Sequence, residues 1–552
     1  MILDLDARGS EALPEYDLCI VGSGPAGMTL VRELERSGLR ICVLESGLTR
    51  KTKRGDELRA TRSEGIHIKA ESRERLLGGA STTWAGLSSP YDAIDTGERS
   101  FLDHSEWPVP RTELLSAYRV CSERYRFPSL ETFEGGAFGG LRAKGDLAPD
   151  WQVLDEKVFL AAAEPQNFGR EWRGIFEGEG ADLWLDATVV ELVSEPGTRR
   201  IQSASIVTKS GTSHSLCAAK FVVATGGIEN ARLLLLSRSL CPEGLGNEHD
   251  QVGRFLMNHP KSYFGVVRFA RPVVDLPYYF GCMYKGYSGY AGLRIAPKLQ
   301  LERGLLDSYV RLEPMFSWTD SQGVEALVLL VKSSGSFFRF WKKQHSDKLV
   351  ELRDYSETGD DSELQGATNS FLGGIGLAWK VLTDLPRVMK YLYYRLSKAK
   401  PKIREARVRN FMEMEPYAEN RVTLCEELDA NGQRLASVRH ACTERDRRSM
   451  IAIHEEFSKE LERTGLGELH NPLTEQDPWP IAQDASHHMG TTRMGTEPLH
   501  SVVDANLKIH GVDNVWLAGG SVFPTSGCAN PTMTLVALSV RLANHLSSLE
   551  SQ

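Results

Sequence analysis

The sequence lacks any continuous apolar run of 18 residues and has no excess of basic residues. A membrane-spanning helix needs about 20 consecutive apolar residues, and residues 1–16 carry acidic side chains where a secretory signal would be apolar. Acidic residues number 73 against 65 basic ones, a net charge of −8, whereas nucleic-acid binding requires a basic face. We therefore expect a cytoplasmic protein that binds no nucleic acid and does not associate with a membrane.

Other absences narrow the chemistry. The nine cysteines include no C-x-x-C pair, and the histidines show neither H-E-x-x-H nor H-x-x-x-H spacing, so we expect no metal site. A G-x-S-x-G nucleophile turn is also missing, because Gly519-Gly520-Ser521-Val522 lacks the second glycine. Cys19 and Cys42 lie in apolar, strand-like runs and fit a reducing compartment. Glycine is plentiful, 50 of 552 residues, which suits close approach of the backbone to a ligand.

Residues 17–47 predict a complete β-α-β nucleotide-binding unit. An apolar strand leads into Gly22-Ser-Gly24-Pro-Ala-Gly27, followed by an amphipathic helix, a second apolar strand and Glu45. These glycines allow a tight turn, close approach of a pyrophosphate and close packing of helix on strand. Glu45 is placed to accept hydrogen bonds from ribose hydroxyls and argues against NADP. The motif alone does not distinguish FAD from NAD, and a glycine turn without a ligand is the simpler alternative.

Three other regions suggest how the chain is organised. Residues 75–90 form a second Gly-rich loop, which taken alone is more typical of a surface turn than of a ring-binding loop. Residues 220–237 predict a strand, a glycine turn and a helix, so we expect the chain to return there to the nucleotide-binding sheet. Residues 91–175 and 265–470 lack this pattern and predict a second domain, whose strands could form the far wall of a cleft.

Residues 371–404 form a basic, aromatic-rich and helix-like segment. It carries eight basic residues against a single acid, Asp384, interleaved with tryptophan, tyrosine, leucine and methionine. A surface helix with a solvated basic side is the first interpretation, an oligomer contact or lid the second, and binding to an anionic membrane surface the third.

The C-terminal region holds the candidate chemistry. His487 lies in His-His-Met-Gly-Thr-Thr-Arg-Met-Gly, and Asn530 lies in Cys-Ala-Asn-Pro-Thr. Oxidation of an alcohol requires a base at the hydroxyl and an electron acceptor at the C–H bond, and a histidine and a flavin N5 meet these needs. An asparagine can hold the same hydroxyl without competing for its proton. A lone histidine before a glycine turn is more often an ordinary loop residue, and His488 shares the position.

Five motifs follow one another along nearly the whole chain. They are the nucleotide-binding turn, Gly78-Gly-Ala-Ser-Thr-Thr-Trp84, Ala224-Thr-Gly-Gly-Ile-Glu-Asn-Ala-Arg-Leu-Leu, Gly253-Arg-Phe-Leu-Met-Asn-His-Pro260 and the C-terminal block. In this they resemble the glucose-methanol-choline (GMC) family of flavoprotein oxidoreductases. With asparagine at 530, the chain looks more like the pyranose 2-oxidase branch, which acts on sugars.

The resemblance implies an α/β fold, in which a Rossmann-like FAD-binding domain is interleaved with an α+β substrate domain containing a mostly antiparallel sheet. Residues 14–90, 176–264 and 480–552 are expected to form the FAD domain, and residues 91–175 and 265–479 the substrate domain, with 371–404 as a possible lid or interface. His487 is implied as general base and Asn530 as the second catalytic residue. The residues assigned to FAD are Gly22, Gly24, Pro25, Ala26, Gly27, Glu45, Ser46, Gly78, Gly79, Ser81, Thr82, Thr83, Trp84, Val189, Ala224, Gly226, Gly519, Gly520, Asn530, Pro531 and Thr532.

The expected reaction is FAD-dependent oxidation of an alcohol, with O2 or a quinone or protein carrier as electron acceptor. Because Thr83 stands where covalently flavinylated pyranose oxidases have a flavin-linked histidine, we expect the FAD to be non-covalent. A sugar, glycoside, cyclitol or aminoglycoside-type polyol is the expected substrate. A sterol or aliphatic alcohol, or a lyase in which FAD is only structural, are the alternatives. The sequence leaves the oligomeric state open.

Overall fold

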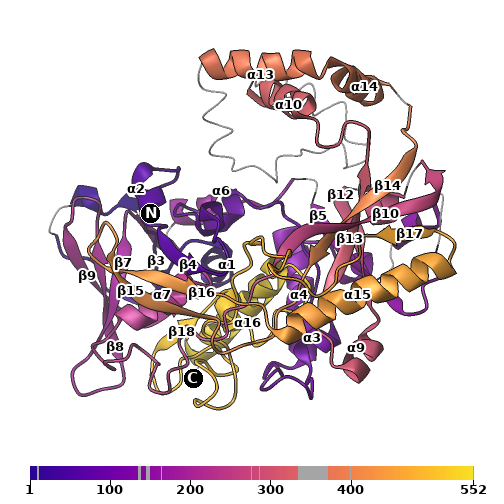
Figure 1. Ribbon diagram of the computed structural model, residues 1–552. Helices are drawn as coiled ribbons and strands as arrows, with labels where there is room; N and C mark the ends of the chain where they lie inside the picture. Colours follow the sequence, from indigo (N-terminus) through magenta and orange to yellow (C-terminus); the bar gives the residue numbers. More distant parts are fainter. Residues whose placement is uncertain are drawn as a thin grey trace.

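A computed structural model describes residues 1–8, 11–134, 138–144, 149–162, 164–178, 180–274, 276–284, 286–333, 371–397 and 399–550. Two large sheets lie side by side, with helices packed on and between them (Figure 1). Residues 334–370 of the expected substrate domain lie outside the described residues.

The first sheet is built around the predicted β-α-β unit. Its strand order is β1-β6-β3-β2-β9-β8-β7, with β18 paired to β9, and the pairs from β1 to β9 and from β9 to β18 are parallel. The short apolar run of β2 is buried almost throughout, as expected for a parallel strand covered on both faces. The strands are β1 Ile2–Asp4, β2 Tyr16–Val21, β3 Ile41–Leu44, β6 Ala181–Leu185, β7 Thr188–Ser194, β8 Ile201–Val207, β9 Ser213–Val223 and β18 Val515–Leu517.

Two helices from opposite ends of the chain pack together on this sheet. Helix α1 (Pro25–Leu34) follows the glycine turn, and α16 (Thr532–Glu550) begins directly after Asn530 and Pro531. This packing places the start of α1 close to the C-terminal helix. The N-terminal turn and the C-terminal block therefore meet in space.

The second sheet is antiparallel. Its order is β11-β12-β13-β14-β10-β17, with β5 paired to β12. The long helix α15 (Glu444–Arg463) packs on it and starts with a capping box in which Thr443 and Asp446 exchange side chain to backbone hydrogen bonds. The strands are β5 Leu154–Ala162, β10 Lys261–Val273, β11 Cys282–Tyr284, β12 Tyr287–Ile295, β13 Tyr309–Met315, β14 Ile403–Phe411 and β17 Gly467–His470.

A small third sheet joins segments that the sequence analysis had separated. Strand β16 (Arg434–Arg439) pairs with β15 (Arg421–Leu428) and also with β4 (Thr61–Glu64) from the nucleotide-binding part of the chain. Strand β10, which begins at Lys261, lies wholly in the second sheet, so the expected boundary at residue 264 falls inside a strand. Backbone pairing across distant segments, which local sequence patterns do not encode, accounts for both differences.

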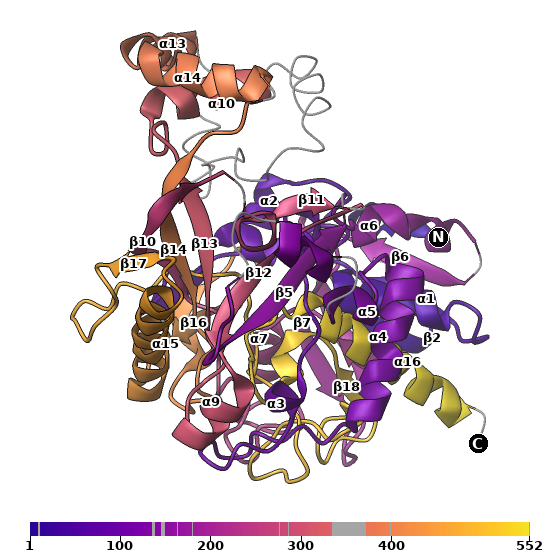
Figure 2. The same ribbon diagram turned by 90° about the vertical axis from the view of Figure 1, so that its right-hand side faces the viewer.

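Helices α10 (Gln322–Ser333), α13 (Phe371–Thr383) and α14 (Leu385–Leu396) form a separate unit that projects away from both large sheets (Figures 1 and 2). It has its own apolar core, made by Trp318, Val324, Val331, Val388 and Tyr391. The unit is joined to the second sheet through β13 and β14. Among the described residues, no helix combines the length and the apolar character needed to cross a bilayer.

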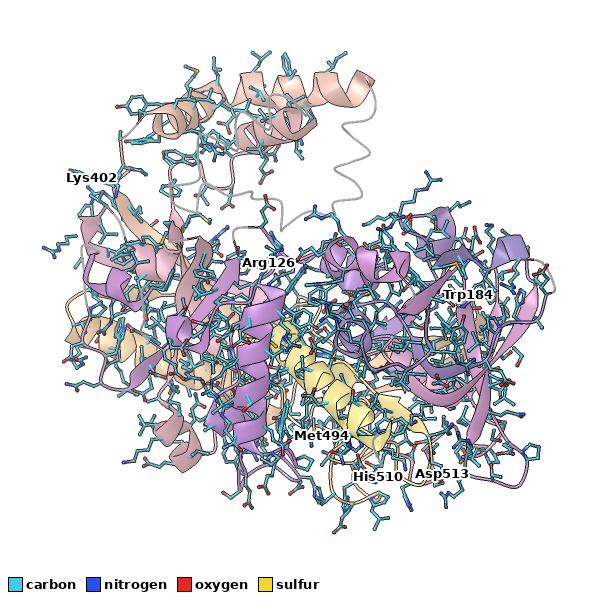
Figure 3. All side chains as sticks on the ribbon, turned by 180° about the vertical axis from the view of Figure 1, so that it is seen from behind. Arg126, Trp184, Lys402, Met494, His510 and Asp513 are labelled. Atoms are coloured by element: carbon cyan, nitrogen blue, oxygen red, sulfur yellow. The ribbon has the colours of Figure 1, made fainter. Side chains whose placement is uncertain are left out.

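Shorter elements complete the described chain, whose side chains are drawn in Figure 3. The helices are α2 Lys53–Glu57, α3 Ala93–Thr96, α4 Arg111–Tyr125, α5 Leu130–Phe133, α6 Phe168–Glu171, α7 Glu229–Leu236, α8 Pro277–Phe280 and α9 Pro297–Arg303. The 3-10 turns are η1 Asp6–Arg8, η2 Ala70–Arg73, η3 Gly79–Thr82, η4 Gly139–Lys144, η5 Arg173–Glu177 and η7 Gly520–Val522.

Candidate active site

The glycine turn has the backbone geometry that its sequence predicts. Gly22 adopts φ +102°, and a Cβ there would lie 2.6 Å from the Ala224 carbonyl oxygen. A Cβ on Gly27 would lie 2.0 Å from the Gly22 carbonyl oxygen, so the start of α1 packs directly on the turn. Glu45 is buried beside the turn, where its carboxylate accepts hydrogen bonds from Ser23 Oγ at 2.6 Å and Gly47 N at 2.8 Å.

Three glycines from three separate segments face open space. Among the described residues, no atom outside the adjoining stretch of chain lies within 4 Å of the position a Cβ would occupy on Gly24, Gly226 or Gly519. Gly24 is also the N-cap of α1, and no side chain caps that helix. An uncapped helix N-terminus bordered by unfilled glycine positions is a suitable site for a diphosphate and its attached rings.

The loop predicted to contact a ring system packs on this turn. Gly79 lies against Gly24, where a Cβ would be 3.0 Å from the Gly24 Cα, and Gly78 N donates to Ser23 O at 3.1 Å. Ser81 is buried, Trp84 Nε1 donates to Gln166 O at 2.6 Å, and Thr82 Oγ1 donates to Gly79 O.

The remaining expected FAD residues lie at the same end of the first sheet. Ala224 N donates to Val21 O, and Ala518 N, just before Gly519-Gly520, donates to Val223 O. Ala187 N, two residues before Val189, donates to Glu45 O. Ser46 Oγ accepts from Arg75 at 3.2 Å.

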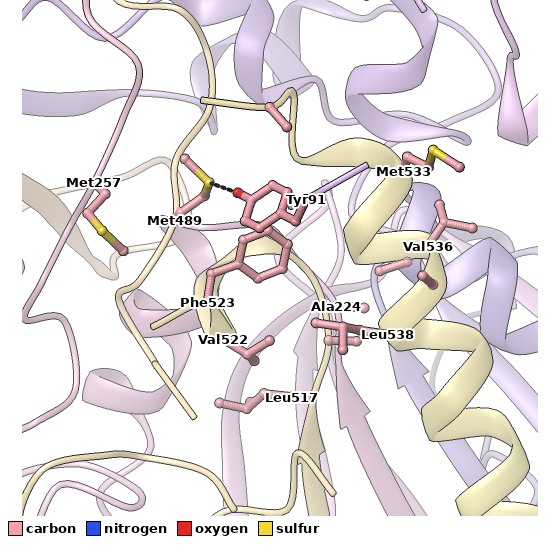
Figure 4. Close-up of a cluster of buried hydrophobic side chains, with 14 of the residues drawn as sticks. Tyr91, Ala224, Met257, Met489, Leu517, Val522, Phe523, Met533, Val536 and Leu538 are labelled. Atoms are coloured by element: carbon pink, nitrogen blue, oxygen red, sulfur yellow. Dashed lines mark hydrogen bonds between the residues drawn. The ribbon is translucent and has the colours of Figure 1, made fainter. Parts of the chain in front are cut away.

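The C-terminal segment that carries His487 is held against these glycines. Gly490 N donates to Gly520 O, Thr492 N donates to Ser521 O, and a Cβ on Gly227 would lie 2.0 Å from His488 O. Behind it lies a packed apolar cluster in which Tyr91 Oη donates to Met489 Sδ at 3.6 Å (Figure 4). This packing leaves the segment little freedom to move away from the nucleotide turn.

His487 and Asn530 meet in space, 43 residues apart in sequence. His487 Nε2 lies 3.3 Å from Asn530 Nδ2, and His487 Nδ1 lies 2.9 Å from Nδ1 of His259. Cys528, two residues before Asn530, packs against aromatic rings of the second sheet, among them Phe159 and Tyr309. The pair therefore lies where the first sheet faces the second.

The hydrogen bonds of His259 determine which nitrogen of His487 carries a proton. His259 Nε2 lies 2.8 Å from Gly527 O and 3.2 Å from Ser526 O, and since carbonyl oxygens only accept, Nε2 must carry hydrogen. Neutral His259 then has a lone pair at Nδ1, which accepts from His487 Nδ1–H. His487 Nε2 is left with a lone pair that faces the Asn530 amide.

Burial favours the neutral form of both rings. It lowers the pKa of His487 well below its usual value, and the nearby positive charge of Lys261 lowers it further. Burial also lowers the pKa of His259. At neutral pH His487 is therefore an unprotonated imidazole, the state that a general base requires.

Comparison with known proteins finds similar sequences and a similar fold. Residues 416–539 match the family model described as GMC oxidoreductase. The 6'''-hydroxyparomomycin C oxidase of Streptomyces lividus is 24% identical over 97% of this chain and 92% of its own length. Pyranose 2-oxidase of Tricholoma matsutake is 41% identical over 12% of this chain and 11% of its own length. Formate oxidase of Aspergillus oryzae RIB40 has the same fold, with a TM-score of 0.55 and 15% identity over 98% of this chain and 100% of its own.

The C-terminal part of the chain, residues 416–539, is thus similar to the GMC oxidoreductases. The resemblance seen in the sequence is thereby confirmed, as is the predicted fold of a Rossmann-like part interleaved with an antiparallel sheet. Relatives that are similar over nearly the full length are named oxidases and dehydrogenases, which supports an oxidoreductase, and the match to the GMC model supports FAD as the cofactor. The uncapped helix α1 and the open positions at Gly24, Gly226 and Gly519 fit that cofactor.

Sequence reasoning missed the residues that hold His487 in place. His259 belongs to the motif that ends at Pro260, but the sequence predicted no role for it. Asn258 accepts from His487 N at 3.4 Å and donates to Asp484 Oδ1 at 2.7 Å. The Asn258-His259-Pro260 motif was the available signal in the sequence. It gave no indication of a contact with His487, because His259 and His487 are 228 residues apart.

The loop that accepts from His259 is itself anchored by a buried ion pair. Gly527 N donates to Glu413 Oε1 at 3.0 Å, and Arg99 donates to both carboxylate oxygens of Glu413 at 2.7 and 2.8 Å. Neither charged side chain is exposed. The orientation of His487 thus depends on contacts that reach from residue 99 to residue 527.

Two other features of the structure lie outside the histidine pair. A cavity of about 1040 Å³ is lined by residues that include Phe255, Glu415 and Arg493, but by neither His487 nor Asn530. Asp92, Asp95 and Asp307 approach one another closely enough to suggest a metal site. Lys157 and Arg294 bind Asp92 at 2.6 and 2.8 Å, so the positive charge in that cluster comes from side chains.

Proposed function

We propose that this enzyme oxidises a CH–OH group of a sugar, glycoside, cyclitol or aminoglycoside-type polyol to a carbonyl, using non-covalently bound FAD. The observation that carries the proposal is the forced tautomer of His487, whose Nε2 lone pair lies beside the Asn530 amide. The full-length similarity to an oxidase that acts on hydroxyparomomycin, an aminoglycoside, supports the substrate class.

The two side chains have complementary roles. A substrate hydroxyl placed between them would donate to His487 Nε2 and accept from Asn530 Nδ2, so its proton points at the base. Its proton moves to Nε2, and the resulting imidazolium stays bonded through Nδ1–H to the lone pair of His259. FAD, when bound, accepts the hydride that leaves the same carbon.

The first sheet and its helices hold FAD in this proposal, and the antiparallel sheet forms the substrate side. The residues that would hold FAD are the expected set given above, from Gly22 to Thr532. Thr83 offers a hydroxyl rather than an imidazole, which supports a non-covalent cofactor. Flavin fluorescence that stays with the denatured polypeptide would refute that part of the proposal.

The test is an anaerobic titration of the purified yellow protein with sugars, glycosides, cyclitols, aminoglycoside precursors and simple alcohols, followed by flavin absorbance. Bleaching by polyols supports the proposal, whereas bleaching only by a sterol or aliphatic alcohol contradicts the substrate class. An absence of bleaching by every compound favours the lyase alternative. Admitting air after bleaching then distinguishes O2 from a quinone or protein carrier as the acceptor.

Variants at the two residues test their roles. His487→Ala should keep FAD yet reduce it about 10²- to 10⁴-fold more slowly, the usual contribution of a positioned base. Asn530→Ala should weaken substrate binding and slow reduction while leaving the pH dependence of the base in place. Reduction of His487→Ala at the unaltered rate would remove His487 from the mechanism.

A further inference from the structure

The helical unit exposes a stripe of large apolar side chains. Ile375, Trp379 and Leu382 on α13 are spaced four and three residues apart, which places them on one face of the helix. Trp379 is 67% exposed and Leu382 is 62% exposed, although each is large and apolar. Such a contiguous patch on a folded protein marks a contact surface.

Helix α14 repeats the same arrangement. Leu385, Met389, Tyr393 and Leu396 are all exposed and follow a spacing of four, four and three residues. Val388 and Tyr391 occupy the buried side of the helix. The exposed apolar residues are therefore not needed for the internal core of the unit, which other side chains already fill.

Basic side chains accompany this apolar face. Lys380 and Lys390 each follow an exposed apolar residue, and Lys402, next to the unit in Figure 3, is also exposed. Asp384 is the only acid among residues 371–404, and it is held by Ser321 and lies 3.7 Å from Arg387. The segment is thus strongly cationic in a protein whose net charge is −8.

The length of these helices fixes how they could meet a bilayer. A helix of 13 residues is about 20 Å long, shorter than the hydrocarbon core of about 30 Å. Helices of this kind, with tryptophan, tyrosine and leucine on one face and lysine or arginine beside it, lie in the plane of the interface. Figures 1 and 2 show that α13 and α14 lie at the outer end of the molecule, away from the sheets.

We propose that the exposed face of α13 and α14 binds the surface of an anionic phospholipid bilayer. A second copy of this chain is the less favourable occupant, because a symmetric contact would bring two strongly cationic segments together. The cytoplasmic leaflet carries the negative charge that these lysines match. This proposal replaces the expectation of no membrane association, and it does not depend on the proposed reaction.

The test is flotation of the purified holoprotein with vesicles of phosphatidylcholine alone and of phosphatidylcholine with 30 mol% phosphatidylglycerol. The protein should float with the anionic vesicles, and binding should weaken as salt rises. Lys380→Glu/Lys390→Glu should bind at least tenfold more weakly, since each basic residue near such a surface contributes about fivefold. Trp379→Ser/Leu382→Ser should bind the anionic vesicles at least tenfold more weakly, because it removes apolar contact with the bilayer.

Matched controls separate this surface from general effects. Leu428→Ser removes an apolar residue that is 60% exposed on β15, and Lys298→Glu reverses a charge that is 87% exposed on α9; both should bind as the unaltered protein does. The double variants should keep their melting temperature, because the changed side chains are exposed. Equal binding by all variants, or no flotation at all, would overturn the proposal. Self-association in sedimentation velocity that Trp379→Ser abolishes, without vesicle binding, would assign the face to a second copy.

Discussion

His259 provides the sharpest test of the proposed base. Its Nδ1 accepts from His487 at 2.9 Å only because the Gly527 and Ser526 carbonyls hold its proton on Nε2. His259→Leu removes this acceptor, so the imidazolium formed during the reaction loses a hydrogen bond to a charged group. Such bonds contribute about 1.5–3 kcal/mol, which corresponds to about a 10- to 100-fold slower flavin reduction.

The pH dependence separates this role from a simple packing defect. Burial already lowers the pKa of His487. Loss of the acceptor for Nδ1–H should lower this pKa further, because the protonated ring gains more from that hydrogen bond than the neutral ring does. The acid limb of the plot of flavin reduction rate against pH should therefore move to lower pH in His259→Leu, while the maximal rate falls. A packing defect would lower the rate at every pH and leave the limb in place.

The assay is anaerobic stopped-flow reduction of the FAD-loaded variant, using the compound that bleaches the unaltered protein fastest. His259→Asn serves as the conservative control, because its amide oxygen can occupy the place of Nδ1 and restore an acceptor. We expect His259→Asn to lie between His259→Leu and the unaltered protein in rate and to keep the acid limb. An unchanged rate in His259→Leu, or identical behaviour of the two variants, would refute the reasoning.

The remaining predictions concern the cofactor site and stability. Gly24→Ala should fold normally, because φ at Gly24 is −69° and the added Cβ has open space, but the purified variant should contain less FAD, measured by flavin absorbance. Gly27→Ala should disrupt folding, which circular dichroism would show. Arg99→Met leaves Glu413 buried without its partner and should cost about 3–5 kcal/mol, seen as a lower melting temperature. Burial lowers the pKa of His454 to about 4, so its neutral form supports folding above pH 6.5 and this support is lost as pH falls toward 4. The difference in unfolding free energy between the unaltered protein and His454→Gln should shrink by about 2 kcal/mol from pH 6.5 to pH 5; a constant difference would contradict this.

Local patterns along the chain were enough to predict the nucleotide-binding unit. Strand, turn and helix between residues 17 and 47 follow from short-range sterics and apolar periodicity, so Gly22, Gly24 and Glu45 could be placed without a structure. The resemblance to the GMC family and the fold class followed because five motifs occur in order along nearly the whole chain. The helices within 371–404 were likewise predicted from composition.

Contacts between distant segments were decided only by the tertiary structure. Nothing in the spacing of His259 and His487 indicates that their rings meet, since that contact depends on how β10 and the C-terminal loop pack. The pairing of β16 with β4 and the exposure of Trp379 depend in the same way on neighbours that lie far along the chain. The sequence by itself therefore determined the nucleotide-binding unit and named His487 and Asn530 as candidate catalytic residues. The protonation state of His487 and the exposed surface of the helical unit were decided by packing, because hydrogen-bond partners and burial arise only when remote segments come together.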